Sequence, residues 1–240
     1  MVFLSTKTGQ FTYFSTQLGQ GDWRGKDVLD FGGNIGNMLH DPDSTIDEER
    51  YWCIDVVRES IEKGKEAFAK AHWVFYDRYC FFFNPQGISQ LKLPELEQSF
   101  DYIVAYSVFT NTSRTDMLDL VQQLTQRLND GGALAFTFFD PRFDRSLSDS
   151  RLPRGSTALR NLGPRGQLEM VKRARWFTVI DDTLYVEPDD ALHHQTRAGR
   201  PHESYCSFFT ADFMKSLFAG ATIREPVCRE WQHCCIIRLK

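Results

Sequence analysis

The stretch that decides the fold is residues 26–39, which read Lys-Asp-Val-Leu-Asp-Phe-Gly-Gly-Asn-Ile-Gly-Asn-Met-Leu. An apolar run at residues 28–29 predicts a short buried strand that stops at Asp30, and a helix-compatible stretch begins at Ile35. The turn between them carries Gly32, Gly33 and Gly36. Glycines permit positive φ and leave no Cβ between the chain and a ligand. The stretch therefore predicts a nucleotide-sized anion or ribose site of open identity.

The rest of the chain repeats the alternation of strand and helix. Further strands are expected at residues 51–55, 72–76, 100–106 and 133–139. Helices are expected at residues 57–70 and 115–128, and a helix or arm within residues 1–24. Alternation at this spacing predicts an α/β fold with a mainly parallel sheet, doubly wound by helices. Ligands of such sheets bind outside the carboxyl ends of the strands.

The chain ends with a capped amphipathic helix, residues 210–218, and two strands at residues 221–229 and 232–239. The link between these strands is too short for a helical crossover, so they should pair antiparallel. We therefore predict seven strands, with the last one antiparallel and inserted into the parallel sheet.

Residues 140–205 interrupt the alternation. Residues 140–175 hold nine basic and four acidic side chains, a local balance of +5, and residues 176–179 and 183–187 are typical of a hairpin. An insertion after the fifth strand lies over the ligand edge, which is the natural place for a substrate lid. A surface loop with scattered arginines is the alternative for residues 142–165. The expected divisions are residues 1–140 (arm and cofactor core), 141–205 (lid) and 206–240 (the rest of the core).

Composition narrows the class of protein. The 240 residues are 42% hydrophobic and 25% charged, with a net charge of −4, which gives no whole-chain case for attraction to nucleic acid or membranes. No stretch reaches about 18 apolar residues, and the start of the chain lacks the pattern of a signal peptide. Six cysteines show no paired spacing, which indicates a reducing compartment. We expect a cytoplasmic monomer or homodimer.

The glycine turn excludes two nucleotide-binding motifs. From Gly32, the pattern G-x-G-x-x-G would require glycine where Asn34 and Asn37 stand, and from Gly33 it fails at Ile35. No Gly-Lys-Ser/Thr follows, so the turn is not a P-loop. This favours a ligand with a ribose and no diphosphate.

Four motifs, in order along the chain, resemble those of class I S-adenosylmethionine-dependent methyltransferases. They are Val28-Leu29-Asp30-x-Gly32-Gly33-Asn34-x-Gly36, the acid Asp55, Phe100-Asp101-x-Ile103 to Phe109, and Leu128-Asn129-Asp130-Gly131-Gly132-Ala133-Leu134. The resemblance covers roughly residues 25–140 and 205–240. A finer similarity, to bacterial small-molecule and secondary-metabolite enzymes, runs through Tyr79, Asn84, Gly87, Pro94 and Ser107-Val108-Phe109-Thr110. Two residues depart from these patterns. Asn34 stands where the first motif has glycine, and Asn111 stands where the bacterial subgroup often has histidine.

The predicted cofactor, S-adenosyl-L-methionine, would occupy the carboxyl ends of the strands. Asp55 is placed to accept both ribose hydroxyls. Asp77 would either accept from the adenine amino group or pair with Arg78, and Tyr13 would either cap the ligand or only pack. The full predicted set is Tyr13, Asp30, Gly32, Gly33, Asn34, Gly36, Asp55, Val56, Asp77, Arg78, Ala105, Tyr106 and Ser107.

Methyl transfer from a sulfonium depends mainly on alignment, and a base is needed only for a poorly acidic hydroxyl or a protonated amine. The candidates are His193, His194, His202 and Asp140, with the adjacent histidine pair ranked first. No metal is expected, because adjacent histidines rarely converge on one ion without a carboxylate. The expected acceptor is a small molecule methylated on O or N, and the +5 insertion would suit an anionic one. An RNA or peptide/protein methyltransferase, or a non-catalytic cofactor-binding partner protein, remains the alternative.

Overall fold

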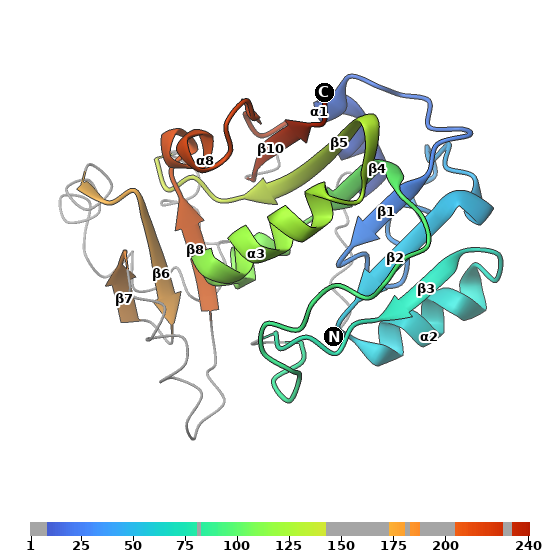
Figure 1. The fold of residues 1–240 in the computed structure, drawn as a ribbon, viewed down its shortest axis with the longest axis horizontal. Coiled ribbons are helices and arrows are strands. Elements are labelled where there is room, and N and C mark those ends of the chain that lie inside the picture. The colour runs from blue at the N-terminus through green and yellow to red at the C-terminus, as the bar shows by residue number, and fades with distance from the viewer. Residues whose placement is uncertain (1–8, 81–82, 143–172, 181–182, 188–204, 228–231) are drawn as a thin grey trace.

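The structure is a computed structural model that describes the chain except residues 1–8, 81–82, 143–172, 181–182, 188–204 and 228–231. A seven-stranded sheet forms its centre, in the order β3-β2-β1-β4-β5-β10-β9 (Figure 1). The strands are β1 Val28–Phe31, β2 Tyr51–Asp55, β3 His72–Phe75, β4 Phe100–Ala105, β5 Leu128–Phe138, β9 Thr222–Arg224 and β10 His233–Arg238. The predicted fold class is confirmed.

β10 is the exception to parallel pairing that the sequence predicted. It lies between β5 and β9 and runs antiparallel to both, with His233 opposite Phe138 and Arg238 opposite Ala133. The other neighbouring pairs, from β3 through β5, are parallel. The carboxyl ends of β1, β2, β4 and β5 therefore share one edge of the sheet, which we call the carboxyl edge.

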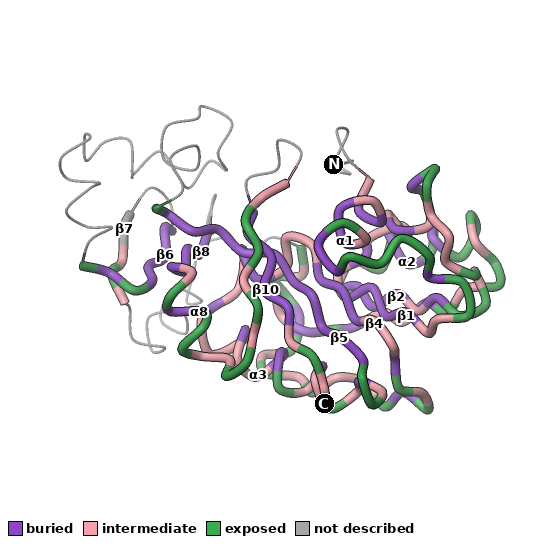
Figure 2. The backbone as a smooth tube through the Cα atoms, turned by 90° about the horizontal axis from the view of Figure 1, so that it is seen from above, coloured by how far each residue is buried: buried purple, intermediate pink, exposed green. Residues whose placement is uncertain are grey.

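Helices cover both faces of the sheet. Helices α1 Gln10–Leu18 and α2 Arg58–Ala67 lie on one face, and α3 Arg114–Thr125 and α8 Ala211–Leu217 lie on the other (Figure 2). Side chains of β5 alternate between the two cores, as the period of a strand requires. Leu134 and Phe136 pack with α3 and α8, whereas the small Ala133 and Ala135 pack with the aromatic side chains of α1. Short 3₁₀ turns, η1 Glu48–Arg50 and η2 Phe109–Asn111, precede β2 and follow β4.

The helices on the second face begin at side-chain caps. Ser113 Oγ accepts the Asp116 N–H at 2.9 Å at the start of α3, and Thr210 Oγ1 accepts the Phe213 N–H at 3.3 Å at the start of α8. Each such cap stabilises its helix by about 1 kcal/mol. The prediction that helix 115–128 continues to residue 128 was wrong. α3 ends at Thr125, and Leu128 already pairs with Phe100 in the sheet, where the register then shifts.

A second, three-stranded sheet has the order β7-β6-β8. β6 Trp176–Ile180 and β7 Thr183–Val186 form the predicted antiparallel pair, whereas β8 Tyr205–Phe209 was not predicted. The Phe209 N–H donates to Phe139 O at 2.9 Å, just past the end of β5, and Ser207 Oγ donates to Thr112 O at 2.8 Å. The small sheet is thus joined to the carboxyl edge, and the expected boundary at residue 205 falls at the start of β8.

Most of the basic residues of the insertion lie outside the described residues. Of those described, Arg142 pairs with Asp140 and Asp212, and Arg175 pairs with Glu187 at 2.8 Å. None of the helices in the described part of the chain combines the length and apolar character that a membrane crossing requires.

Candidate active site at the carboxyl edge

The glycine turn lies at the end of β1 and is held by neighbouring strands. The Gly32 N–H donates to Ile54 O at 2.7 Å, and a Cβ on Gly32 would lie 2.4 Å from Val108 Cγ2. Gly32 has φ +78° and Gly36 has φ +88°, in the region that favours glycine. A Cβ on Gly33 would lie 2.5 Å from Asp30 Cγ. The predicted glycines are therefore required by geometry at this turn.

The prediction of a helix from Ile35 was wrong. Residues 34–39 form consecutive turns, with the Gly36 N–H donating to Gly33 O and the His40 N–H donating to Gly36 O, each at 3.0 Å. The left-handed conformation of Gly36 interrupts the right-handed path that an α-helix requires. The turn therefore offers individual backbone N–H groups and no helix N-terminus for an anion.

Asp55, at the end of β2, holds this turn. Its Oδ2 accepts the Asn34 N–H and its Oδ1 accepts the Val57 N–H, both at 2.8 Å. The residue is 8% exposed, and burial raises the pKa of its carboxyl against the opposing effect of these N–H donors. Each carboxylate oxygen has a further lone pair, so the group keeps acceptor capacity for a ligand hydroxyl.

Asn34, the departure from the glycine pattern, has a structural explanation. Its φ is +56°, and asparagine enters this left-handed region more readily than other non-glycine residues. Ser60 Oγ in α2 donates to Asn34 Oδ1 at 2.7 Å. Asn34 therefore ties the glycine turn to α2 through its side chain, which glycine could not do, and to Asp55 through its backbone N–H.

Asp30 lies behind the turn and is 1% exposed. Tyr51 Oη donates to Asp30 Oδ2 at 2.7 Å, while Oδ1 is buried without a hydrogen bond of standard geometry. Burial raises the pKa of Asp30 to about 7, opposed by the hydrogen bond from Tyr51 and by the nearby Met38 N–H and reinforced by the charge of Asp55. Tyr51, which sequence reasoning missed, is thus the partner of the first-motif acid.

This burial predicts an unusual pH dependence. An unfolded chain loses the Asp30 proton near pH 4, roughly, whereas the folded protein keeps it up to about pH 7. Between these values the folded state binds the extra proton, so stability falls as the pH rises through this window. Asp30→Asn removes this dependence, and we expect its stability relative to wild type to improve by about 2 kcal/mol between pH 5 and pH 8. Urea denaturation at both pH values measures it; parallel changes would show that Asp30 is already ionised at the lower pH.

Asp77 and Arg78 do not pair with each other. Asp77 Oδ1 accepts from Asn84 Nδ2 at 2.9 Å, and the buried Arg78 guanidinium binds Asp116 and Asp119 of α3. It also donates to Leu91 O at 2.8 Å. Arg78 thus fixes the segment after β3 to α3, and Asp77 keeps acceptor capacity at the carboxyl edge.

The remaining predicted residues lie in α1, just after β2 and around the end of β4. Tyr13 of α1 is 1% exposed, and its ring meets that of Tyr106 edge-on, with the ring centroids 5.4 Å apart. Ala105 is fully buried, Val56 is half-buried, and Ser107 has φ +58°.

The candidate bases fall into two groups. Asp140 is 4% exposed; its Oδ2 accepts the Ala211 N–H and its Oδ1 the Arg142 N–H, both at 2.8 Å, so it holds the start of α8. His193, His194 and His202 lie outside the described residues. A further histidine, His233 in β10, was not among the predicted bases. It is 6% exposed, and burial lowers its pKa against the opposing effect of the charge of Asp140.

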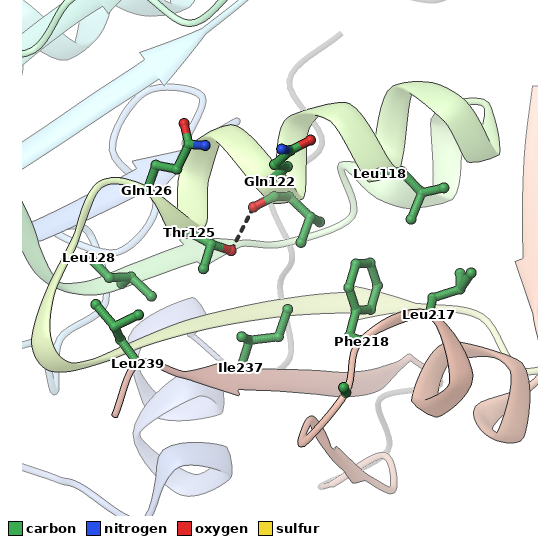
Figure 3. A pocket seen from close by; sticks show the side chains of 11 residues that line it. Leu118, Gln122, Thr125, Gln126, Leu128, Leu217, Phe218, Ile237 and Leu239 are labelled. Atoms are coloured by element: carbon green, nitrogen blue, oxygen red, sulfur yellow. Dashed lines mark hydrogen bonds between the residues drawn. The ribbon is translucent and has the colours of Figure 1, made fainter.

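An apolar groove of about 640 Å³ lies elsewhere, between α3, the end of α8 and β10 (Figure 3). Its lining includes Leu118, Gln122, Phe218, Ile237 and Leu239. None of the predicted site residues that the structure describes lines it, so this groove is separate from the carboxyl edge.

Comparison with known proteins agrees with this geometry. Residues 29–134 match the family model described as a methyltransferase domain. The glycopeptide N-methyltransferase MtfA, solved with sinefungin, superposes with a TM-score of 0.56 at 10% identity, over 99% of this chain and 96% of MtfA. An S-adenosylmethionine-dependent methyltransferase from Clostridium acetobutylicum gives 0.52 at 10% identity, over 95% and 90%.

The pyocyanin biosynthetic protein PhzM gives a TM-score of 0.48 at 12% identity, and this chain, 95% covered, spans only 54% of its length. At these identities the solved structures establish the fold, and the family match of residues 29–134 adds the type of domain. Both findings agree with the resemblance predicted from the motifs: residues 29–134 match a methyltransferase domain, and the solved methyltransferases share the fold of this chain.

Proposed function

We propose that the chain transfers the methyl group of S-adenosylmethionine to an oxygen or nitrogen of a small molecule at the carboxyl edge. One observation carries the proposal. The Asn34 N–H and the Asp55 carboxylate meet at 2.8 Å, which brings the glycine turn and the ribose acceptor into one rigid unit. The turn, with its isolated N–H groups and no helix N-terminus, suits a ligand with a ribose and no diphosphate.

Different residues would bind different parts of the cofactor. Asp55 would accept the ribose hydroxyls, and Gly32 and Gly33 would let the backbone approach the amino-acid end. Asp77 would accept a hydrogen bond from the adenine amino group, and the side chain of Tyr106 would form a wall of the cofactor site beside it. S-adenosylmethionine supplies an activated methyl group, so the protein's task is to hold nucleophile, methyl and sulfur in line.

We also propose that the acceptor enters between the carboxyl edge and the three-stranded sheet. In this division residues 1–140 and 206–240 form the cofactor core, and residues 141–205 supply the acceptor side. The bond from Ser207 Oγ to Thr112 O supports this placement, since it sets β8 against the segment after β4. A preference for anionic acceptors rests on the basic composition of residues 140–175.

Calorimetry tests the cofactor first. We expect S-adenosylhomocysteine to bind the wild-type protein with one site per chain, and NADH to give no heat of binding under the same conditions. Tight binding of NADH without binding of S-adenosylhomocysteine would overturn the proposal.

The acceptor class is then found with methyl-labelled S-adenosylmethionine and a metabolite extract, an RNA fraction and a protein fraction in parallel. We expect the label in the small-molecule fraction. Label in RNA or protein would replace the acceptor class proposed here, and binding without any transfer would indicate a non-catalytic cofactor-binding protein.

A further inference from the structure

Three residues after β4, in β5 and before β10 form a closed ring of hydrogen bonds. The Ser107 N–H donates to Thr137 Oγ1 at 2.7 Å, and Thr137 Oγ1 donates in turn to Gln232 Oε1. Gln232 Nε2 completes the ring by donating to Ser107 Oγ. The Thr137 hydroxyl thus accepts from the Ser107 N–H and donates to Gln232 Oε1, while the Gln232 amide nitrogen faces Ser107 Oγ.

The ring has two buried members and a half-buried one, Ser107, and it joins distant parts of the chain. Thr137 is 0% exposed and Gln232 is 7% exposed. The Gln232 backbone oxygen also accepts from Tyr13 Oη of α1 at 3.2 Å. Gln232 thus connects α1, β5 and the end of β4, and two of these elements carry predicted cofactor residues.

The ring closes around a strained residue. Ser107 has φ +58°, in a region that serine rarely enters. This conformation turns the chain out of β4. The backbone oxygen of Ser107 then accepts hydrogen bonds from Thr110 Oγ1 at 3.0 Å and from Asn111 Nδ2 at 3.1 Å. Asn111 stands where histidine often occurs in the related subgroup. The backbone angle at Ser107 therefore sets the place of both Tyr106 before it and η2 after it.

We propose that Gln232 is a positioning residue of the methyltransferase site, which holds Ser107 in its left-handed conformation and so fixes the wall formed by Tyr106 and Tyr13. It acts through Ser107 and does not itself touch the reacting atoms. The inference rests on the proposed function, because that wall matters for binding only if the cofactor lies against it.

Gln232→Met tests this, since methionine has a similar length and volume but cannot complete the ring. We expect its affinity for S-adenosylhomocysteine to fall about tenfold, the effect of about one buried hydrogen bond. Gln17→Met is the matched control. Gln17 is also a buried glutamine, 3% exposed, and donates to Glu225 O at 3.1 Å, one helical turn beyond Tyr13 and outside the ring of hydrogen bonds. We expect it to lower the melting temperature and keep the affinity within about twofold. Equal affinities for the two variants would overturn the proposal.

Ser107→Gly provides the second, independent test. Glycine adopts φ near +60° without strain, so it no longer needs the ring. In the Ser107→Gly background we expect Gln232→Met to change the affinity by less than about twofold. A loss as large as in the wild-type background would show that Gln232 acts by another route and would overturn the proposal.

A pair of variants covers the case in which Gln232→Met does not fold. Ser107→Ala opens the same ring but keeps the need for an unfavourable φ, whereas Ser107→Gly removes that need. We expect weaker binding for the alanine variant than for the glycine variant, and equal binding would count against the proposal. If wild type itself fails to bind S-adenosylhomocysteine, the proposed function fails; if wild type binds and Gln232→Met binds equally, only the present inference fails.

Discussion

Replacing Asp55 with alanine is expected to weaken the binding of S-adenosylhomocysteine by a factor of about 100 or more, as measured by calorimetry. Two causes act together. The variant loses the charge-assisted hydrogen bonds proposed to the two ribose hydroxyls, which are among the stronger hydrogen bonds in proteins. It also leaves the Asn34 and Val57 N–H groups, now bound at 2.8 Å, without their acceptor, and so loosens the glycine turn.

Asp101→Ala is the control for this experiment. Asp101 accepts the Asp27 N–H at 2.9 Å at the start of β4, at the opposite edge of the sheet from Asp55. Like Asp55→Ala, the Asp101→Ala substitution removes a carboxylate that accepts a backbone N–H, but this carboxylate lies away from the proposed ligand. We expect affinity close to that of wild type. Near-wild-type affinity of Asp55→Ala would show that this carboxylate does not hold the ribose.

The second large effect is expected on stability. Arg78→Met should lower the free energy of unfolding by about 3 kcal/mol, the scale for breaking a buried ion pair by removing one partner. The Arg78 side chain is 4% exposed and binds two carboxylates, Asp116 and Asp119, which are then left side by side without their common cation. Methionine fills much of the volume, so the loss reports on the charges and hydrogen bonds and less on a cavity.

Urea denaturation measures this effect, and Lys63→Met provides the comparison. Lys63 pairs with Glu59 on the exposed face of α2, where solvent screens the interaction. We expect no measurable change in that variant. A similarly small change in Arg78→Met would show that the Arg78 cluster contributes little net stability, because the burial of its charges offsets their attraction.

The strands of the sheet and the antiparallel direction of the last one could be predicted from the sequence because the evidence for them is local. Each strand is a short apolar run, and the direction of β10 follows from the short link that precedes it. A helix was predicted from Ile35 because the apolar spacing of Ile35, Met38 and Leu39 resembles that of a helix, and this prediction was wrong. What decides the outcome is the φ of +88° at Gly36, which the spacing does not reveal.

The residues of the candidate site likewise fall into those that the sequence predicted and those that it did not. The glycines and Asp55 lie within short motifs, so their meeting at one edge follows once the parallel order of the strands is known. Gln232 and Thr137 belong to no motif, and they are 125 and 30 residues from Ser107 along the chain. Tyr51 and the α3 partners of Arg78 are likewise tertiary contacts. Their signal, a polar residue at a buried position, becomes visible only when the fold is known.

The insertion of β10 into the sheet has a consequence for how the molecule folds. β5 can complete its pairing only when residues 233–238 arrive, and Tyr13 of α1 can meet Gln232 only across 219 residues of chain. Contacts this distant are slow to form, because the entropy of closing the loop must be lost before they contribute. During synthesis, β5 and the four parallel strands that precede it in the chain emerge before β10, the strand that pairs with β5. We therefore expect the ring of Ser107, Thr137 and Gln232 to form among the last events of folding, and until then the edge of β5 is open to pairing with another chain.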